Sequence, residues 1–271
     1  ATNFFKNNKA LAQRLCEKAS KLSELRNQFK ASKKMITALN SAKKRGMPAK
    51  YAPYDSKSKI EDRELLIVEG ESAGGSLREV RSSYQAMLPL KGKCVNVLRC
   101  AEQRALESEE IINILSAVGY DPKSDNPAAK LQVSRVICLA DHDDDGCHIN
   151  TLLLTIFYRF LPQMFDKGMI YVADMPEFYA EYKNTVVIGQ TLSEVKQKLA
   201  DLGAPKSTPT PHIKGWGEIS QQLLKSLVVD KSTRKLIRIK PITDNDRVTF
   251  VRVMNEDVAF RRQMLGLSDS V

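Results

Sequence analysis

The chain has 271 residues, 42% of them hydrophobic and 27% charged, so it can bury at least one sizeable core. Its longest apolar run, residues 152–165, is interrupted by Arg159 and Pro162, and no secretory pattern is seen, so we expect a cytoplasmic protein with no membrane partner. Its five cysteines form no CxxC pair, which argues against a disulfide framework or a zinc site.

Positive charge is concentrated at the start of the chain. Residues 1–60 contain 15 lysines and arginines against 3 acidic residues, a net charge of +12, whereas the remaining residues carry −2. Residues 3–40 are rich in helix-forming residues and contain neither Pro nor Gly. We therefore expect a basic segment over 1–62 in which a helix over 3–40 is followed by a basic break at 41–48 and a turn-rich linker. This segment either contacts nucleic-acid phosphates or presents a solvated face.

Strands and helices alternate from residue 64 onward. The expected strands cover 65–68, 94–98, 136–140 and 169–173. The expected helices open near Ser72, cover 108–118 with Ser108 as N-cap, and run from about His148 to Phe165. This alternation is typical of an α/β domain, here 63–180, with a parallel, doubly wound sheet flanked by helices.

The pattern changes in the tail, residues 181–271, which we expect to form a smaller α+β region. The expected elements are a helix over 192–202, a Pro/Thr-rich linker over 205–211, a helix over 221–229, a strand over 234–239, and a helix or strand over 248–254.

Acidic residues follow two of the expected strands. The sequence EGESAGG (69–75) follows the strand at 65–68, and DHDDDG (141–146) follows the strand at 136–140. Carboxylates at the carboxyl ends of adjacent parallel strands converge in the crevice where such sheets bind ligands. Carboxylate oxygens are the ligands that Mg²⁺ prefers, so this edge of the sheet is a candidate magnesium site.

Four carboxylates are the candidate ligands. While the chain remains extended, Asp141, Asp143 and Asp145 project to one side, and Glu69 reaches them from the neighbouring strand. Four such charges would repel one another without a cation. A calcium-binding EF-hand loop is excluded because its twelfth position, which requires Glu, is Leu152.

The motifs and their order resemble the Toprim region and tail of the gyrase B-type subunit of type II DNA topoisomerases. EGESAGG (69–75) is similar to EGDSAGG, LPLKGK (88–93) to LPLxGK, DHDDDGCHI (141–149) to DADVDGxHI, and KGWGEI (214–219) to KGLGEM. The departures Glu71, Asn150 and Trp216 suggest a divergent lineage, such as the large subunit of T-even-like phages. The resemblance implies a Rossmann-like Toprim sheet.

The resemblance also implies a chemistry. Glu69, Asp141, Asp143 and Asp145 would be catalytic residues that hold one or two Mg²⁺ ions at the scissile phosphate of double-stranded DNA. The holoenzyme would cleave and religate that DNA to change its topology. The chain would therefore be part of an ATP-hydrolysing type II topoisomerase associated with the nucleoid of a bacterial or phage-infected cell.

Two components that the family needs are missing from this sequence. The nucleophilic tyrosine of the family follows an arginine, and none of the eight tyrosines here does. No phosphate-binding P-loop is present either, so ATP would act only through an N-terminal ATPase domain outside this chain. The resemblance therefore implies a gyrase A-type partner that carries the tyrosine, and a chain that is inactive alone.

Basic and aromatic residues give the remaining expectations. The candidate DNA contacts are Lys43, Lys44, Arg45, Lys91, Lys93 and His148. A structural role for His148 at the start of a helix is an equal alternative. Trp216 either stacks on a base or, more simply, packs in the interior.

Two other functions fit the same residues. A stand-alone Toprim nuclease or primase-like enzyme would use the carboxylates with water or a nucleotide as nucleophile. A non-enzymatic DNA-binding scaffold would retain the fold with a decayed acidic site. The KGWGEI and LPLKGK motifs argue against the first alternative, and the presence of all four carboxylates argues against the second.

Overall fold

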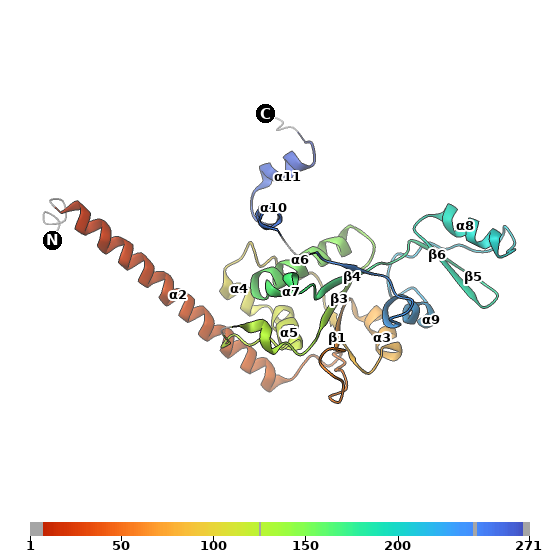
Figure 1. Cartoon of the computed structure of the whole chain (residues 1–271), viewed down its shortest axis with the longest axis horizontal. Coiled ribbons are helices and arrows are strands. Elements are labelled where there is room, and N and C mark those ends of the chain that lie inside the picture. The colour runs from red at the N-terminus through yellow and green to blue at the C-terminus, as the bar shows by residue number, and fades with distance from the viewer. Residues whose placement is uncertain (1–7, 125, 241–242, 268–271) are drawn as a thin grey trace.

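A computed structural model describes residues 8–124, 126–240 and 243–267, and its centre is a five-stranded sheet (Figure 1). The strands are β1 (Glu64–Glu69), β2 (Gln85–Leu90), β3 (Arg135–Leu139), β4 (Ile170–Ala173) and β7 (Leu236–Arg238), in the spatial order β2-β1-β3-β4-β7. The first four are parallel, and β7 is antiparallel to β4. The predicted α/β class, with a mostly parallel sheet flanked by helices, is confirmed.

Both faces of the sheet are buried. Side chains alternate along a strand, so Leu65 and Ile67 enter one hydrophobic core while Leu66 and Val68 enter the other. The first face is covered by α4 (Glu102–Glu107), α5 (Glu109–Val118), α6 (Asp144–Phe160) and α7 (Gln163–Asp166). The second face is covered by α3 (Glu71–Val80), α9 (Gln221–Leu224) and the π-helical turn η2 (Lys225–Val229). This burial explains why the strands read as continuous apolar runs.

One expected strand was wrong. Residues 94–98 form a loop in which the Asn96 side chain accepts a hydrogen bond from the Leu98 N–H, a local turn that competes with strand pairing. The second strand is instead β2, an edge strand in which Pro89 is tolerated.

The helix after the second acidic motif begins earlier than expected and also ends earlier. It starts at Asp144 rather than near His148, because Asp143 caps it, and it stops at Phe160 just before Pro162. The predicted Ser108 cap of α5 is confirmed, since its hydroxyl accepts from the Ile111 N–H.

The tail first leaves the sheet and then returns to it. The hairpin β5 (Phe178–Tyr182) and β6 (Thr185–Gly189), which was not predicted, packs against α8 (Leu192–Asp201) in a small core of its own. Figure 1 shows this unit projecting from one side of the sheet. Residues 213–229 then pack on the second face, and β7 follows.

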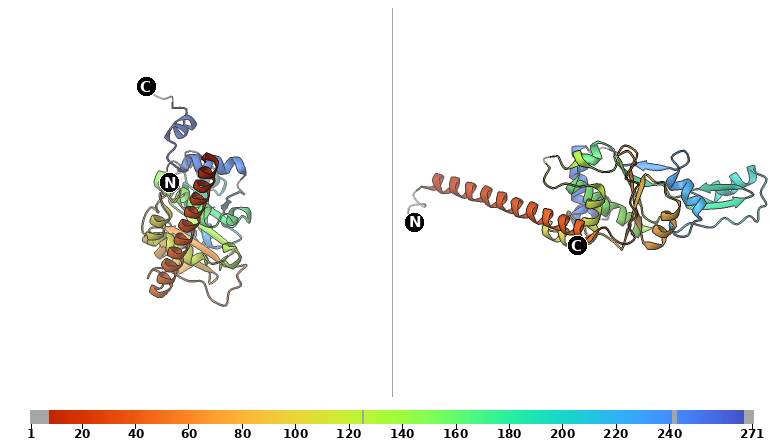
Figure 2. Two further views of the ribbon diagram at one scale, coloured as in Figure 1. Left: turned by 90° about the vertical axis from the view of Figure 1, so that its left-hand side faces the viewer. Right: turned by 90° about the horizontal axis from the view of Figure 1, so that it is seen from below.

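The remaining helices lie around this body. They are α2 (Lys9–Arg45), the 3₁₀ turn η1 (Pro127–Lys130), α10 (Asp244–Met254) and α11 (Val258–Met264). Figure 2 shows α2 extending away from the sheet. Among the α2 side chains that the structure describes, Met35 and Leu39 near its end are the ones buried in the core. The helix expected over 3–40, whose residues 3–7 lie outside the described residues, continues to Arg45, so the break expected at residue 41 begins only at Gly46. Within the described ranges, no helix has the length and apolar character needed to cross a bilayer.

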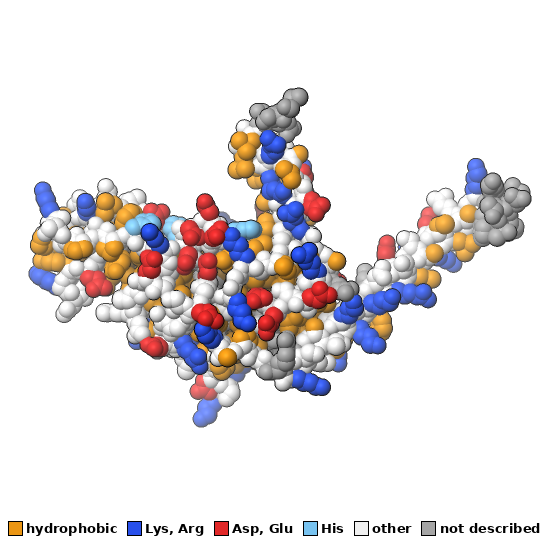
Figure 3. Space-filling model, turned by 180° about the vertical axis from the view of Figure 1, so that it is seen from behind, with side chains coloured by type: hydrophobic (Ala, Val, Ile, Leu, Met, Phe, Trp, Pro, Cys, Tyr) orange, Lys and Arg blue, Asp and Glu red, His pale blue; other side chains and the backbone are white. Residues whose placement is uncertain are grey.

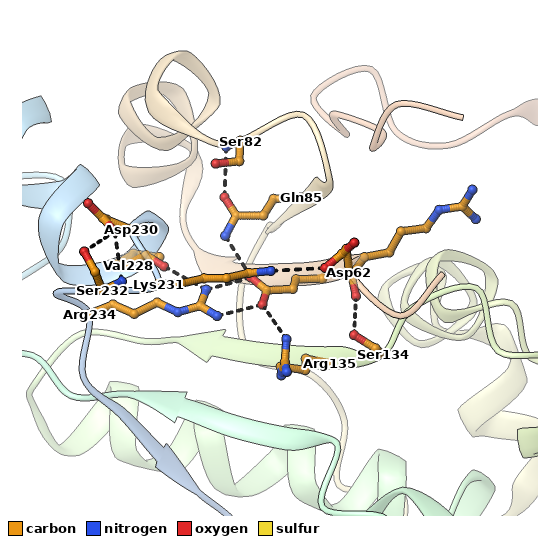
Figure 4. A network of polar contacts seen from close by, with 12 residues as sticks. Asp62, Ser82, Gln85, Ser134, Arg135, Val228, Asp230, Lys231, Ser232 and Arg234 are labelled. Carbon is orange, nitrogen blue, oxygen red and sulfur yellow. Dashed lines mark hydrogen bonds and ion pairs between the residues drawn. The ribbon is translucent and has the colours of Figure 1, made fainter. Parts of the chain in front are cut away.

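A buried ion cluster fastens the tail to the sheet at the amino end of β1 (Figure 4). Glu64 is fully buried and accepts two hydrogen bonds from the Arg234 guanidinium, at 2.6 and 2.7 Å. Arg135 Nη1 and Gln85 Nε2 lie 3.1 and 2.9 Å from the same carboxylate. Residues from β1, β2, β3 and the tail thus meet at one carboxylate.

Candidate metal centre

The two acidic motifs meet at the opposite end of the sheet. Strand β1 ends at Glu69, and β3, its parallel neighbour, ends two residues before Asp141. The Asp141 N–H donates a 3.0 Å hydrogen bond to Glu69 Oε2, so Glu69 does reach the second motif. The order of the sheet reverses between these two strands, since β2 lies beyond β1 on one side and β4 lies beyond β3 on the other.

The other two predicted ligands are directed elsewhere. Asp143 Oδ1 accepts a 2.7 Å hydrogen bond from the Gly146 N–H as the N-cap of α6. Asp145 lies in the first turn of that helix, where its carboxylate pairs with Lys93 Nζ at 2.6 Å. The expectation of an extended Asp-x-Asp-x-Asp run was wrong, because the chain turns helical at Asp144 and the alternation stops.

A four-carboxylate cage is therefore not assembled. Across the described parts of the chain, no three His, Cys, Asp or Glu side chains come together in an arrangement that could hold a metal ion. The donor chemistry nevertheless fits a hard cation, since Glu69 and Asp141 both carry carboxylates and the backbone N–H of Asp141 bonds Glu69 Oε2, which places the two residues side by side. Asp143 and Asp145 lie next to them along the chain and would complete the set only by leaving their present hydrogen-bond partners.

The electrostatics of the pair favour a cation. Burial raises the pKa of Glu69 above its ordinary value, and the charges of Asp141, Asp143 and Asp145 raise it further, against the hydrogen bond from the Asp141 N–H. Burial also raises the pKa of Asp141, as do Asp143 and Glu218, while the Trp216 N–H opposes the rise. A bound divalent ion would relieve both the desolvation and the repulsion.

A loop of the tail, residues 214–218, covers Asp141. The Trp216 N–H donates to Asp141 Oδ1 at 3.1 Å, and the indole Nε1–H donates to the Ala140 carbonyl at 2.9 Å. Trp216 is fully buried, so the packing interpretation of this residue holds. Sequence reasoning did not identify this contact, although the two glycines flanking Trp216 were a signal of close backbone approach.

The predicted DNA contacts are distributed along the chain. Lys93 lies at the site through its ion pair with Asp145, whereas Lys91 lies 3.7 Å from Glu109 at the start of α5. His148 is exposed in α6, and Lys44 is exposed near the end of α2. The side chains of Lys43 and Arg45 lie outside the described residues. On the face drawn in Figure 3, acidic side chains gather in a patch beside histidine, with Lys and Arg around it.

One ion pair and one histidine–carboxylate contact near the site were not predicted. Lys50, in the segment after α2, pairs with Glu71 of the first acidic motif. His142 Nδ1 lies 4.0 Å from Glu177. Both contacts are partly exposed, so they contribute little to stability.

The chain is similar in sequence to Toprim-containing proteins. The Toprim domain family matches residues 64–175. The chain is 34% identical over 273 residues to the B-type subunit of DNA gyrase from Thermotoga maritima, covering 96% of this chain and 41% of the relative. It is 36% identical over 222 residues to the corresponding gyrase protein of Archaeoglobus fulgidus, covering 81% and 34%. It is 35% identical over 230 residues to the B-type subunit of DNA topoisomerase 4 from Haemophilus influenzae, covering 84% and 36%. The chain thus spans less than half the length of these relatives.

Proposed function

The chain belongs with the Toprim-containing B-type subunits of type II DNA topoisomerases, and from this premise we propose that it supplies the magnesium-binding part of a DNA cleavage site. In this proposal Glu69 and Asp141 hold Mg²⁺, with Asp143 and Asp145 as the further ligands. A gyrase A-type subunit supplies the nucleophilic tyrosine, and an ATPase domain outside this chain supplies the coupling to ATP. The contact between Asp141 and Glu69 at the reversal point of the sheet carries the proposal.

The residues divide the chemistry among them. When bound, Mg²⁺ would act as a Lewis acid on the scissile phosphate and as a template for in-line displacement. Glu69 and Asp141 would fix the position of that charge, since each projects from the end of a buried strand. Lys93 lies next to the carboxylates, where it pairs with Asp145. It would contact a neighbouring DNA phosphate once its ion pair with Asp145 is broken. His148 and the basic end of α2 would contribute similar contacts farther along the duplex.

Plasmid cleavage with a tyrosine-bearing subunit tests this proposal. We expect Mg²⁺-dependent cleavage, with protein attached to the DNA ends, only when both subunits are present. Asp141→Asn should lower cleavage by about 100-fold or more, because the metal contributes several kcal/mol to such displacements. Asp144→Asn is the matched control, since this exposed carboxylate lies at the start of α6 and outside the proposed ligand set.

The alternatives predict different results in the same assay. Cleavage by this chain alone would contradict the topoisomerase proposal and support a Toprim nuclease. DNA binding without cleavage under any pairing, and equal behaviour of Asp141→Asn and wild type, would support a scaffold whose acidic site no longer functions.

A further inference from the structure

The carboxylate of Asp141 is held by a part of the chain that lies far away in sequence. Trp216, 75 residues downstream, donates its backbone N–H to Asp141 Oδ1, and its indole donates to the carbonyl of Ala140. The side chain and the preceding peptide of the same strand end are thus both fixed by one tail residue. A carboxylate at the end of a strand would otherwise rotate freely about its side-chain bonds.

Gly215 brings the loop into direct contact with that carboxylate. A Cβ atom added at Gly215 would lie 2.6 Å from Asp141 Oδ2 and 2.8 Å from its Cγ. A side chain at position 215 would force the Asp141 carboxylate to shift, so glycine is what permits this close approach. The backbone of the loop therefore closes one side of the carboxylate and leaves fewer orientations open to it.

The loop cannot move away easily, because its centre is anchored in the core. Trp216 is fully buried, and Ile213 and Ile219 on either side of the loop are 1% and 5% exposed. All three belong to the core on the second face of the sheet. Displacing the loop would expose this apolar surface to water, which is strongly unfavourable.

We propose that Gly215 and Trp216, in the loop of residues 214–218, form a positioning clamp that fixes the orientation of the Asp141 carboxylate for a divalent cation. The clamp rests on the proposed role of Asp141 as a metal ligand and extends it to a tail segment that would not touch the metal. Partners that orient metal ligands typically contribute 10- to 100-fold to metal affinity. Tight metal binding would thus require the tail to be in place, even though the candidate ligands all come from the Toprim domain.

Gly215→Ala tests the clamp, and Gly217→Ala is the matched control in the same loop. The added Cβ at position 217 would approach the Ser72 hydroxyl at 3.1 Å, which can rotate away, and would not approach Asp141. The measurements are calorimetric titration of the purified chain with Mg²⁺ and the melting temperature without metal. We expect Gly215→Ala to weaken Mg²⁺ binding by roughly 10-fold or more, with Gly217→Ala unchanged and both melting temperatures similar.

The outcomes separate the clamp from the proposed function. Equal Mg²⁺ affinity of Gly215→Ala and wild type would overturn the clamp, provided that Asp141→Asn no longer binds Mg²⁺. Equal loss of affinity and melting temperature in both glycine variants would also overturn it, because the loop would then be merely structural. If Asp141→Asn binds Mg²⁺ as wild type does, the proposed metal site itself fails.

A second variant keeps the test open if Gly215→Ala does not fold. Trp216→Phe retains an aromatic ring in the core and the backbone N–H that bonds Asp141, but it loses the hydrogen bond to Ala140. We expect a folded protein with a smaller loss of Mg²⁺ affinity. Unchanged affinity in this variant would count against the clamp.

Discussion

Strand β1 carries a glutamate at each end, and the two have opposite environments. Glu64, at the amino end, is fully buried and surrounded by Arg234, Arg135 and Gln85 (Figure 4). Burial alone would raise its pKa, but hydrogen bonds from Arg234 and Gln85 and the charges of both arginines bring the pKa below its ordinary value. This carboxylate is neutralised within the fold.

Glu69, at the carboxyl end, has carboxylates instead of arginines as neighbours. Its pKa is raised by burial and by the nearby aspartates. Within the described ranges, neither Glu69 nor Asp141 forms an ion pair with a Lys or Arg side chain. One strand can therefore hold a structural carboxylate at one end and, at the other, a carboxylate that is available to a metal ion. The tail supplies a positive charge, that of Arg234, to Glu64 and not to Glu69.

The largest expected effect is at the structural end. Glu64→Gln leaves the buried Arg234 without its counter-charge, and breaking such a pair costs about 3–5 kcal/mol. Urea unfolding followed by circular dichroism measures this change. The exposed Glu61→Gln is the control and should change the stability by less than about 0.5 kcal/mol. Equal stability of Glu64→Gln and Glu61→Gln would contradict a structural role for the carboxylate at the amino end of β1.

The next effect is at the metal end and appears only with Mg²⁺. At a Mg²⁺ concentration about 100 times the dissociation constant, the wild-type chain should gain about 2.7 kcal/mol of stability. Glu69→Gln should lose most of this gain, whereas its metal-free stability should not fall, because a repulsive charge has been removed. Thermal unfolding with and without Mg²⁺ measures both quantities. A metal-free loss as large as that of Glu64→Gln would show that Glu69 is structural too.

The smallest effect is a pH trend of opposite sign at the two ends. The folded pKa of Glu64 is lowered, so its contribution is present above its ordinary pKa of 4.5 and is lost as the pH falls through the folded value. The folded pKa of Glu69 is raised, so its contribution is present below the ordinary pKa and is lost as the pH rises through the folded value. We would measure the urea midpoint of unfolding for wild type and each variant from about pH 3 to 7. The midpoints of Glu64→Gln and wild type should become equal as the pH falls. For Glu69→Gln, the advantage of the variant should grow as the pH rises, and parallel curves would contradict the assignment.

Sequence patterns predicted a helix, strand or cap correctly where the residues of that element alone determine its conformation. The buried runs 65–68 and 136–140 were recognised as strands, and Ser108 was recognised as a cap, because apolar runs and cap residues act over a few positions. The strand expected at 94–98 and the missed hairpin β5–β6 failed for the complementary reason. Which apolar run pairs in a sheet depends on competition among neighbours that are distant in the chain.

The sequence by itself determined which carboxylates follow strands, and the motifs identified the family. Only the tertiary structure decided how these groups are used. Glu69 meets the backbone of Asp141 across 72 residues, Trp216 holds Asp141 across 75, and Arg234 neutralises Glu64 across 170. Local periodicity carries no information about such pairs, because each contact forms only when the sheet order and the return of the tail bring the partners together.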